Sequence, residues 1–298
     1  MKAKHKSPPP PATSAMRGRY KTLRMKQLKL LIILFVFISC NSGDTVNIET
    51  ELPFLFENGF EISGNDIDDL ILPDASSWTN IQLQNPNNGT NTISISTDKF
   101  NEGVKSLKIV ALPSDEILSK ADIEKFGFNA PIGSTIKIEA DFYINTNEDL
   151  TDLFLLDLEC CSCWDSNVPD NQCPGIRLKI GGDNEYLSIE RGKIINSTIG
   201  QSEISFPKFE WVNVVWEMEL SQENTGRNNL SINGIEVISS EGINMPNPEL
   251  FKQEFASVGT DFTLPEDVFY ERVQIGATAN PTPNSIEMYI DNFKLTIE

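Results

Sequence analysis

The sequence predicts an all-β protein, a β-sandwich with at most one short helix. Apolar and polar residues alternate in many segments after residue 53, with the period of two that turns one face of a strand toward a core. Asn-Gly pairs separate several of these segments, and Asn233-Gly234 is the clearest hairpin signal. Helical periodicity is weak and allows one short helix within 113–126. Many alternating strands with almost no helix indicate two packed sheets.

The expected strands follow one another along the chain. In 135–144 every second residue from Ile136 to Ile144 is apolar, and the residues between them are polar or charged apart from one tyrosine. The same alternation occurs in 153–159, 176–180, 186–190, 212–220 and 285–290. The last strand changes phase at Asp291-Asn292, which predicts a β-bulge there.

Charge is unevenly distributed over the 298 residues. The chain has 24 Lys and Arg against 43 Asp and Glu, and residues 1–39 contain nine of the basic residues and none of the acidic ones. The remainder is therefore strongly acidic and is not expected to bind nucleic acid or an anionic bilayer surface. The only histidine is His5. If residues 1–39 are removed, no Ser-His-Asp triad, Cys-His pair, histidine-ligated zinc or histidine base is possible.

The N-terminal segment has the layout of an export signal. Basic residues precede the apolar run 30–38, which is shorter than the ~20 residues needed to span a bilayer. The run ends at Ser39-Cys40, which resembles the lipobox of bacterial lipoproteins, although Phe37 stands where leucine is usual. This resemblance implies that Cys40 is acylated and becomes the mature N-terminus. A plain signal peptide or a membrane anchor is the alternative.

Three parts of the chain are expected. Residues 1–39 form the signal segment, with translation starting at Met25 or Met16, because no apolar pattern precedes them. Residues 40–53 are polar and form a lipidated tether, and residues 54–298 form one sandwich domain.

Several motifs of the mature chain resemble a known group of sandwiches. They are FENGFE at 56–61, Trp78, DKFNEGVKSLKI at 98–109, EWVNVVWEMEL at 210–220, NLSINGIEV at 229–237 and YIDNFKLTIE at 289–298. These motifs resemble jelly-roll carbohydrate-binding modules and concanavalin A-like lectins and glucanases. The resemblance implies a jelly-roll sandwich that handles polysaccharide. With the lipobox, it implies an outer-membrane lipoprotein of a polysaccharide-utilisation system in a Bacteroidetes-type bacterium.

A structural calcium ion is one implication of this resemblance. In the resembling modules, an acid on the first strand and an acid on the last strand bind calcium, which prefers several hard oxygen ligands. Glu61, Asp98 and Asp291 occupy the matching positions. The alternative is that they are ordinary solvated acids in an acidic chain.

Four cysteines lie close together, at positions Cys160, Cys161, Cys163 and Cys173. An exported protein meets an oxidising environment, so two disulfides are expected here. A 160–161 bridge would be a strained vicinal disulfide, which leaves two pairings: 160–163 with 161–173, or 160–173 with 161–163. A four-cysteine zinc site is the alternative, but paired C-x-x-C ligands are missing.

Three aromatic side chains are candidates for stacking on a sugar ring. Trp164 lies in the loop that the cysteines close, Trp211 begins a strand in the phase opposite to the core, and Tyr186 points away from the core residues of its strand. The alternatives are that Trp164 covers a disulfide and that Trp211 caps one end of the sandwich. Trp216 has the opposite phase to Trp211 and is expected in the core.

Glycoside hydrolysis has weak support. Glucanases of the resembling group carry E-x-D-x-E on one strand, with the two glutamates as nucleophile and acid/base. Asp157 and Glu159 match the last two positions, but Leu155 replaces the first glutamate. This strand therefore lacks the nucleophile of a retaining mechanism.

A polysaccharide lyase needs a base, an acid and a group that neutralises the uronate carboxylate. Tyr143 and Tyr186 are candidates for base and acid, and Arg177 and Lys179 for the neutralising group, because all four lie opposite the core phase of their strands. If these strands are neighbours, the four form one patch. The motifs R-x-E-x-R, Q-I-H and Y-x-K-x-G-x-Y-x-Q of alginate-type lyases are absent. Ordinary solvated side chains are the alternative.

Together these features predict a lipid-anchored protein of the cell outer membrane, on its surface or periplasmic side, whose partner is a polysaccharide or oligosaccharide. The first expected function is glycan binding, with transfer of the glycan to an uptake receptor. A polysaccharide lyase is the alternative, a glycoside hydrolase is less favoured, and a structural or adhesion lipoprotein is the third option. The acidic chain favours a neutral glycan.

Overall fold

The computed structural model describes residues 53–84, 91–113, 119–163, 174–192, 197–261, 263–265, 267–280 and 284–298. The predicted signal segment, Cys40, the tether as far as residue 52, Trp164 and Cys173 lie outside these ranges. Contacts divide the chain into Met1–Thr50 and Glu51–Glu298, and all described residues belong to the second unit. No helix in the described ranges is long and apolar enough to cross a membrane.

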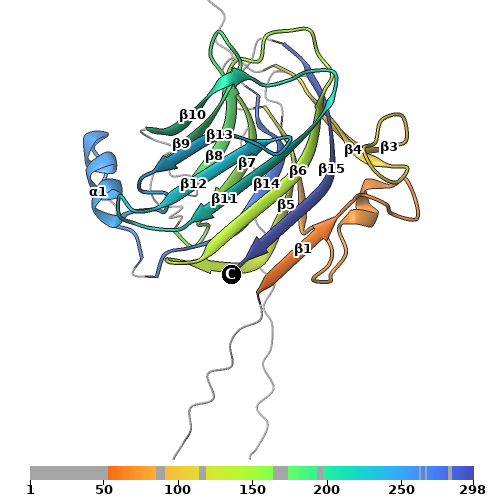
Figure 1. The fold of residues 1–298 in the computed structure, drawn as a ribbon. Coiled ribbons are helices and arrows are strands. Elements are labelled where there is room, and N and C mark those ends of the chain that lie inside the picture. Colours follow the sequence, from red (N-terminus) through yellow and green to blue (C-terminus); the bar gives the residue numbers. More distant parts are fainter. Residues whose placement is uncertain are drawn as a thin grey trace, which may run out of the picture. The chain divides into compact units, whose positions relative to one another are not determined.

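Two antiparallel sheets form the domain (Figure 1). Sheet A contains, in spatial order, β13 (Ile235–Glu241), β12 (Arg227–Ile232), β11 (Trp211–Glu219), β6 (Thr135–Ile144), β15 (Ile286–Ile297), β4 (Ser106–Ala111) and β3 (Thr92–Ser96), and β1 (Phe54–Asn58) also pairs with β15. Sheet B contains β10 (Ser197–Ser205), β9 (Tyr186–Arg191), β8 (Gly175–Gly181), β7 (Leu153–Glu159), β14 (Phe269–Ala279), β5 (Lys120–Pro131) and β2 (Asn80–Gln84). This arrangement confirms the predicted sandwich.

The core lies between the sheets and is made by the apolar members of the alternating strands. Trp216 is 1% exposed, which confirms its predicted core position. An aromatic cluster lies near the start of the domain, where Trp78 stacks on Phe60 and meets Phe56 edge-on at a centroid distance of 5.0 Å. Phe293 from β15 closes this cluster at 4.8 Å from Trp78. The first and last strands are therefore packed together through the same indole.

The helices differ from the expectation. The prediction of a helix within 113–126 is wrong, because Lys120–Pro131 forms a strand, β5. This strand pairs with β14 on one side and with β2 on the other. The α-helix is instead α1 (Pro248–Ser257), and a 3₁₀ turn, η1, spans Ile67–Leu70. The side chain of Asn247 accepts a hydrogen bond from the Leu250 amide and caps α1, whose first residue is a proline. Asn-Pro is a helix-start signal of known type.

Two predicted irregularities are confirmed. Asn233 and Gly234 form the tight turn between β12 and β13, and both have the positive φ angles (49° and 76°) that this turn needs. The register between β15 and β6 shifts between Asp291 and Lys294, with Asn292 at φ 50°. This β-bulge is the predicted change of phase: the alternation of side chains between the two faces of β15 shifts by one residue after Asp291.

Candidate functional site

The outer face of sheet B, turned away from the core, carries a row of polar and charged side chains. Strand register places Glu124, Gln274, Asp157, Arg177 and Glu190 opposite one another on β5, β14, β7, β8 and β9. The four charged members are at most intermediate in exposure, and Gln274 is fully buried. Apart from the strands of the two sheets, no helix or strand of the described chain has extensive contacts with these strands. The outer face of these strands therefore carries more charged side chains than a purely structural role of the sheet requires.

Glu124 is the centre of the hydrogen-bond network on this face. Its carboxylate accepts from Asn80 at 2.8 Å, and from Gln82 and Gln274 at 2.5 Å each. Arg272 Nη1 lies 3.3 Å from Glu124 Oε1. Three amides and a guanidinium thus hold a carboxylate that is 1% exposed, which satisfies the need of a buried charge for partners.

Each of the two arginines lies between a carboxylate and an aromatic ring. Arg272 forms an ion pair with Glu159, and its guanidinium carbon lies 5.3 Å above the ring centre of Phe126. Arg177 Nε lies 3.3 Å from Asp157 Oδ1, with its guanidinium 5.2 Å above the ring of Phe154. Ring stacking and the ion pairs fix both planes, which is the arrangement in which arginine binds further carboxylates well. These contacts involve the residues Arg272, Glu159, Phe126, Arg177, Asp157 and Phe154.

Arg177 keeps an unused donor. Its Nη2 is buried and makes no hydrogen bond to any described residue. On the same strand, Lys179 Nζ lies 3.1 Å from Asp152 Oδ1 and 3.4 Å from Glu190 Oε1. Tyr186 on β9 pairs with Gly181, so it is the diagonal neighbour of Lys179 on the same face.

Asp122 is the most perturbed acid on this face. It lies on β5 opposite Gly276, is fully buried, and neither of its carboxylate oxygens has a hydrogen-bond partner among the described residues. Burial raises the pKa of Asp122 well above its ordinary value, and Glu124 and Asp157 raise it further, against a lowering effect of Lys120. Asp122 therefore keeps its proton well above the pH at which an aspartate normally ionises.

The predicted lyase residues are only partly brought together. Arg177, Lys179 and Tyr186 share the outer face of sheet B because β8 and β9 are neighbours. Tyr143 does not join them: it lies on β6 in sheet A, next to β11 and β15. The phase of a strand shows which residues point outward, but not to which of two sheets the strand belongs.

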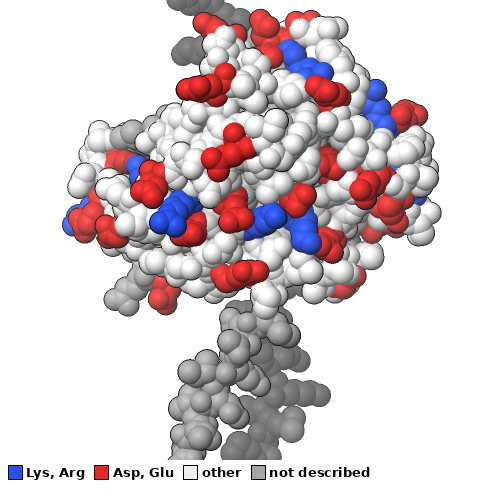
Figure 2. Space-filling view, in the orientation of Figure 1, with Lys and Arg blue, Asp and Glu red and all other residues white. Residues whose placement is uncertain are grey.

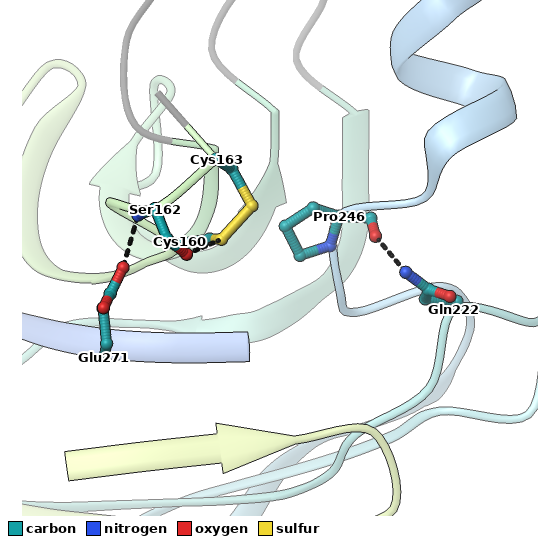
Figure 3. Close-up of a disulfide and its surroundings, with 6 residues drawn as sticks. All are labelled: Cys160, Ser162, Cys163, Gln222, Pro246 and Glu271. Atoms are coloured by element: carbon teal, nitrogen blue, oxygen red, sulfur yellow. Dashed lines mark hydrogen bonds between the residues drawn. A yellow bond between two sulfur atoms is a disulfide. The ribbon is translucent and has the colours of Figure 1, made fainter. Parts of the chain in front are cut away.

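The disulfide region lies directly after β7. Cys160 and Cys163 form a disulfide with a Cα–Cα distance of 5.3 Å, which agrees with one of the two predicted pairings (Figure 3). The backbone amide of Ser162, inside this turn, donates a hydrogen bond to the carboxylate of Glu271 on β14. The turn is thus held to the strand that carries Arg272.

Two of the three acids predicted to bind calcium, Glu61 and Asp291, hold the 98–105 loop by hydrogen bonds. Glu61 accepts from the amides of Val104 and Lys105 at 2.7 and 2.8 Å, and Asp291 Oδ2 accepts from the amides of Asn101 and Glu102 at 2.8 and 3.1 Å. Within the described ranges, no three acids, histidines or cysteines are grouped as metal ligands would be. The calcium site stays a prediction.

Several residues of the sheet B face were not expected from the sequence: Asp122, Glu124, Arg272 and Gln274. In β5, Asp122 and Glu124 alternate with the buried Ala121 and Ile123, so a strand pattern was present in a segment assigned to a helix. In β14, Arg272 and Gln274 likewise alternate with core residues. A period-two count over these two segments finds all four.

Comparison with known proteins gives the fold. No protein-family model matches this sequence, and no curated protein sequence matches it. Among solved structures, an endo-β-1,4-glucuronan lyase from the fungus Trichoderma reesei is similar with a TM-score of 0.51 at 12% identity, over 73% of this chain and 90% of that one. The alginate lyase Aly36B is similar with a TM-score of 0.52 at 12% identity, over 82% of this chain and 97% of that one.

This chain has the jelly-roll fold of these lyases. The predicted fold class is therefore confirmed, and the similarity extends over most of both chains. At 12% identity the similarity shows the fold alone. The function of the sheet B face depends on the side chains that this chain itself places there.

Proposed function

We propose that this protein is a polysaccharide lyase that cleaves a uronate-containing glycan on the outer face of sheet B. The observation that carries the proposal is that Arg177, Lys179 and Arg272 share one face with Tyr186. A jelly-roll fold shared with a glucuronan lyase and an alginate lyase supports it. We therefore favour a polysaccharide lyase over a protein that only binds a glycan.

The elimination needs three roles, and this face offers side chains for each. Lys179, which is paired with Asp152 and Glu190 in the structure, exchanges one of these partners for the uronate carboxylate, and this neutralisation acidifies the hydrogen on the adjacent carbon. Tyr186 as phenolate removes that hydrogen, the electron pair forms the ring double bond, and the bond from the next ring carbon to the glycosidic oxygen breaks. The resulting phenol returns the proton to the leaving oxygen, so atoms and charges balance.

The two arginines bind neighbouring sugar units. Arg272 and Arg177 lie two strands apart and two residues out of register, about 12 Å at the usual strand spacing and rise per residue. They can therefore meet carboxylates of different units in one chain, and Arg177 Nη2, which is buried without a partner among the described residues, can bond to one of them once the side chain moves outward.

The test is an elimination assay on alginate, polyglucuronate and pectate. Wild type should release unsaturated ends that absorb in the ultraviolet. Tyr186→Phe and Lys179→Met should each lower kcat by about 100-fold or more, the usual scale for a lost acid-base or electrostatic group. Lys137→Met, an exposed lysine of sheet A, is the matched control and should keep full activity. Absence of unsaturated product from all three polymers, or full activity in Tyr186→Phe, contradicts the proposal.

We also propose that the protein is exported and anchored to the outer membrane through Cys40. The apolar run ending at Ser39-Cys40 supports the anchor. The Cys160–Cys163 disulfide fits an oxidising compartment outside the cytoplasm.

A further inference from the structure

The outer face of sheet A carries an aromatic row that the lyase reaction does not use. Strand register places Lys108, Tyr289, Tyr143 and Trp211 opposite one another on β4, β15, β6 and β11. The Tyr143 ring meets Tyr289 and Trp211 edge-on, at centroid distances of 6.0 and 5.7 Å. These strands lie in front in Figure 1.

Two of the rings already have a cation beside them. Lys99 Nζ lies 4.3 Å above the ring centre of Tyr143, and Lys108 Nζ lies 5.4 Å from that of Tyr289, which is 3% exposed. No cation from the described chain lies over the half-buried indole of Trp211. Trp211 is therefore the ring of this row that can receive the apolar face of a sugar.

A polar pocket adjoins the row one step further along the same strands. Asp291, Asp141 and Asn213 each lie two residues from Tyr289, Tyr143 and Trp211 on the same face and are again in register across the antiparallel strands. Asp141 and Asn213 line a pocket of about 590 Å³, which is of the usual size for a ligand site, and Asp291 lies beside Asp141 outside its lining. Its other lining residues include Asn101, Glu102, Glu139 and Asn292.

Hydrogen bonds fix the orientation of the polar groups in this pocket. Asp141 Oδ2 accepts from the side-chain amides of Asn101 and Asn292 at 2.7 Å each, and Asp141 Oδ1 accepts from Asn213 at 2.8 Å. The amides of Asn101 and Asn292 each have a second donor hydrogen and an acceptor oxygen, and Asn213 directs its second donor to Glu139 at 3.3 Å. A carboxylate surrounded by carboxamides thus offers both acceptors and donors, which is the combination that sugar hydroxyl groups need.

Charge determines the class of ligand. The pocket lining contains Glu57, Glu102, Glu139 and Asp141 against one cation, Lys294, whose ammonium is 2.5 Å from Glu57 and so already paired. Acidic side chains are also more widespread than basic ones over the face in view in Figure 2. A uronate or sulfate would be repelled here, whereas a neutral sugar would not.

We propose that the outer face of sheet A binds a neutral glycan, with Trp211 stacked on a sugar ring and Asp141, Asn213 and Asn101 bonded to its hydroxyl groups. This site is on the opposite sheet from the lyase face and does not depend on the lyase proposal. The protein would hold a neutral polysaccharide on one sheet and a uronate chain on the other.

The test is calorimetric titration of the full mature protein with cellohexaose, mannohexaose, xylohexaose and laminarihexaose. At least one should bind, and Trp211→Ala should weaken that binding by about 10-fold or more, as expected for loss of an aromatic anchor. Asn213→Ala, a surface polar change, should weaken it as well and serves if Trp211→Ala does not fold. Added salt should change the affinity little, because no charge on the ligand is involved.

Tyr186→Phe on sheet B is the matched control and should bind the neutral hexasaccharide as tightly as wild type. Absence of binding to all four hexasaccharides overturns the proposal. So does a binding loss in Tyr186→Phe with unchanged affinity in Trp211→Ala and Asn213→Ala, because the sugar would then occupy sheet B.

Discussion

At the scale of single residues, two ionisable side chains of β5, Asp122 and Lys125, are buried in different ways. Asp122 is fully buried without a hydrogen-bond partner in the described chain, and Lys125, its near neighbour on β5, is 3% exposed on the opposite, core-facing side. Lys125 Nζ donates to the carbonyls of Ala75 and Ser77 at 2.7 and 2.6 Å and lies 4.5 Å above the ring of Phe56. Burial keeps the Asp122 carboxyl group protonated and uncharged, whereas the buried ammonium group of Lys125 is stabilised by its carbonyl partners and the aromatic ring.

Asp122 should make stability depend on pH. Its pKa is raised in the folded protein, so above about pH 4 the unfolded chain ionises while the folded protein keeps the proton. The contribution of Asp122 to stability is therefore present at low pH and is lost as pH rises toward the folded-state pKa. Asp122→Asn removes this loss. The difference in Tm between variant and wild type should grow in favour of the variant from pH 4 to pH 8 in thermal scans; a difference that does not change with pH contradicts the assignment.

Lys125 should be needed for stability despite its charge. Burial lowers its pKa, but replacing it by methionine removes the donor from the part-buried carbonyl of Ala75 and from the buried carbonyl of Ser77. Lys125→Met should destabilise the domain by about 2–3 kcal/mol in denaturant unfolding, within the range for a buried polar group that loses its partner. The exposed Lys137→Met is the control and should change stability by less than about 0.5 kcal/mol. Equal stability of the two variants would show that Lys125 is not a structural donor.

At the scale of elements, the turn after β7 connects the disulfide region to the proposed lyase face. The Cys160–Cys163 bridge closes a turn of sequence separation 3, and Ser162 inside it is hydrogen-bonded to Glu271 of β14. Since 160–163 is formed, the predicted partner of Cys161 is Cys173.

The second disulfide is directly testable. Alkylation of the unreduced protein followed by peptide mass spectrometry should label no cysteine within 160–173 and should recover Cys161 and Cys173 in one disulfide-linked species. Cys161→Ser should expose one alkylatable thiol, at Cys173, and serves as the positive control. Any label in the unreduced wild type shows that the second bridge is missing.

At the scale of the whole molecule, two sheets of one acidic sandwich carry two different chemistries. Sheet B has arginines and a lysine among its carboxylates, whereas the pocket on sheet A has carboxylates, amides and an indole. An exported protein with both faces would bring a uronate polymer and a neutral polymer together at the cell surface.

Anchoring is tested at the same scale. Cys40→Ala removes the acylation site and should move the protein from the membrane fraction to the soluble fraction, because a single acyl-anchored tether is its expected link to the bilayer. Cys161→Ser, which removes a thiol elsewhere in the chain, should stay with the membrane. Membrane partitioning of Cys40→Ala equal to wild type would contradict the lipoprotein proposal.

The sequence by itself determined the class of the fold, the Asn233-Gly234 hairpin, the bulge at Asp291 and the core position of Trp216, because each depends on local periodicity or on turn chemistry. It also reduced the disulfide pairings to two. Only the tertiary structure decided which strands are neighbours. That order separated Tyr143 from Arg177, Lys179 and Tyr186, and it brought Glu124, Gln274 and Arg272 beside them from strands far apart in the chain. Alternation gives the side of a strand on which a residue lies, whereas a site is made by pairing between distant strands, and that pairing is set by packing of the whole sandwich.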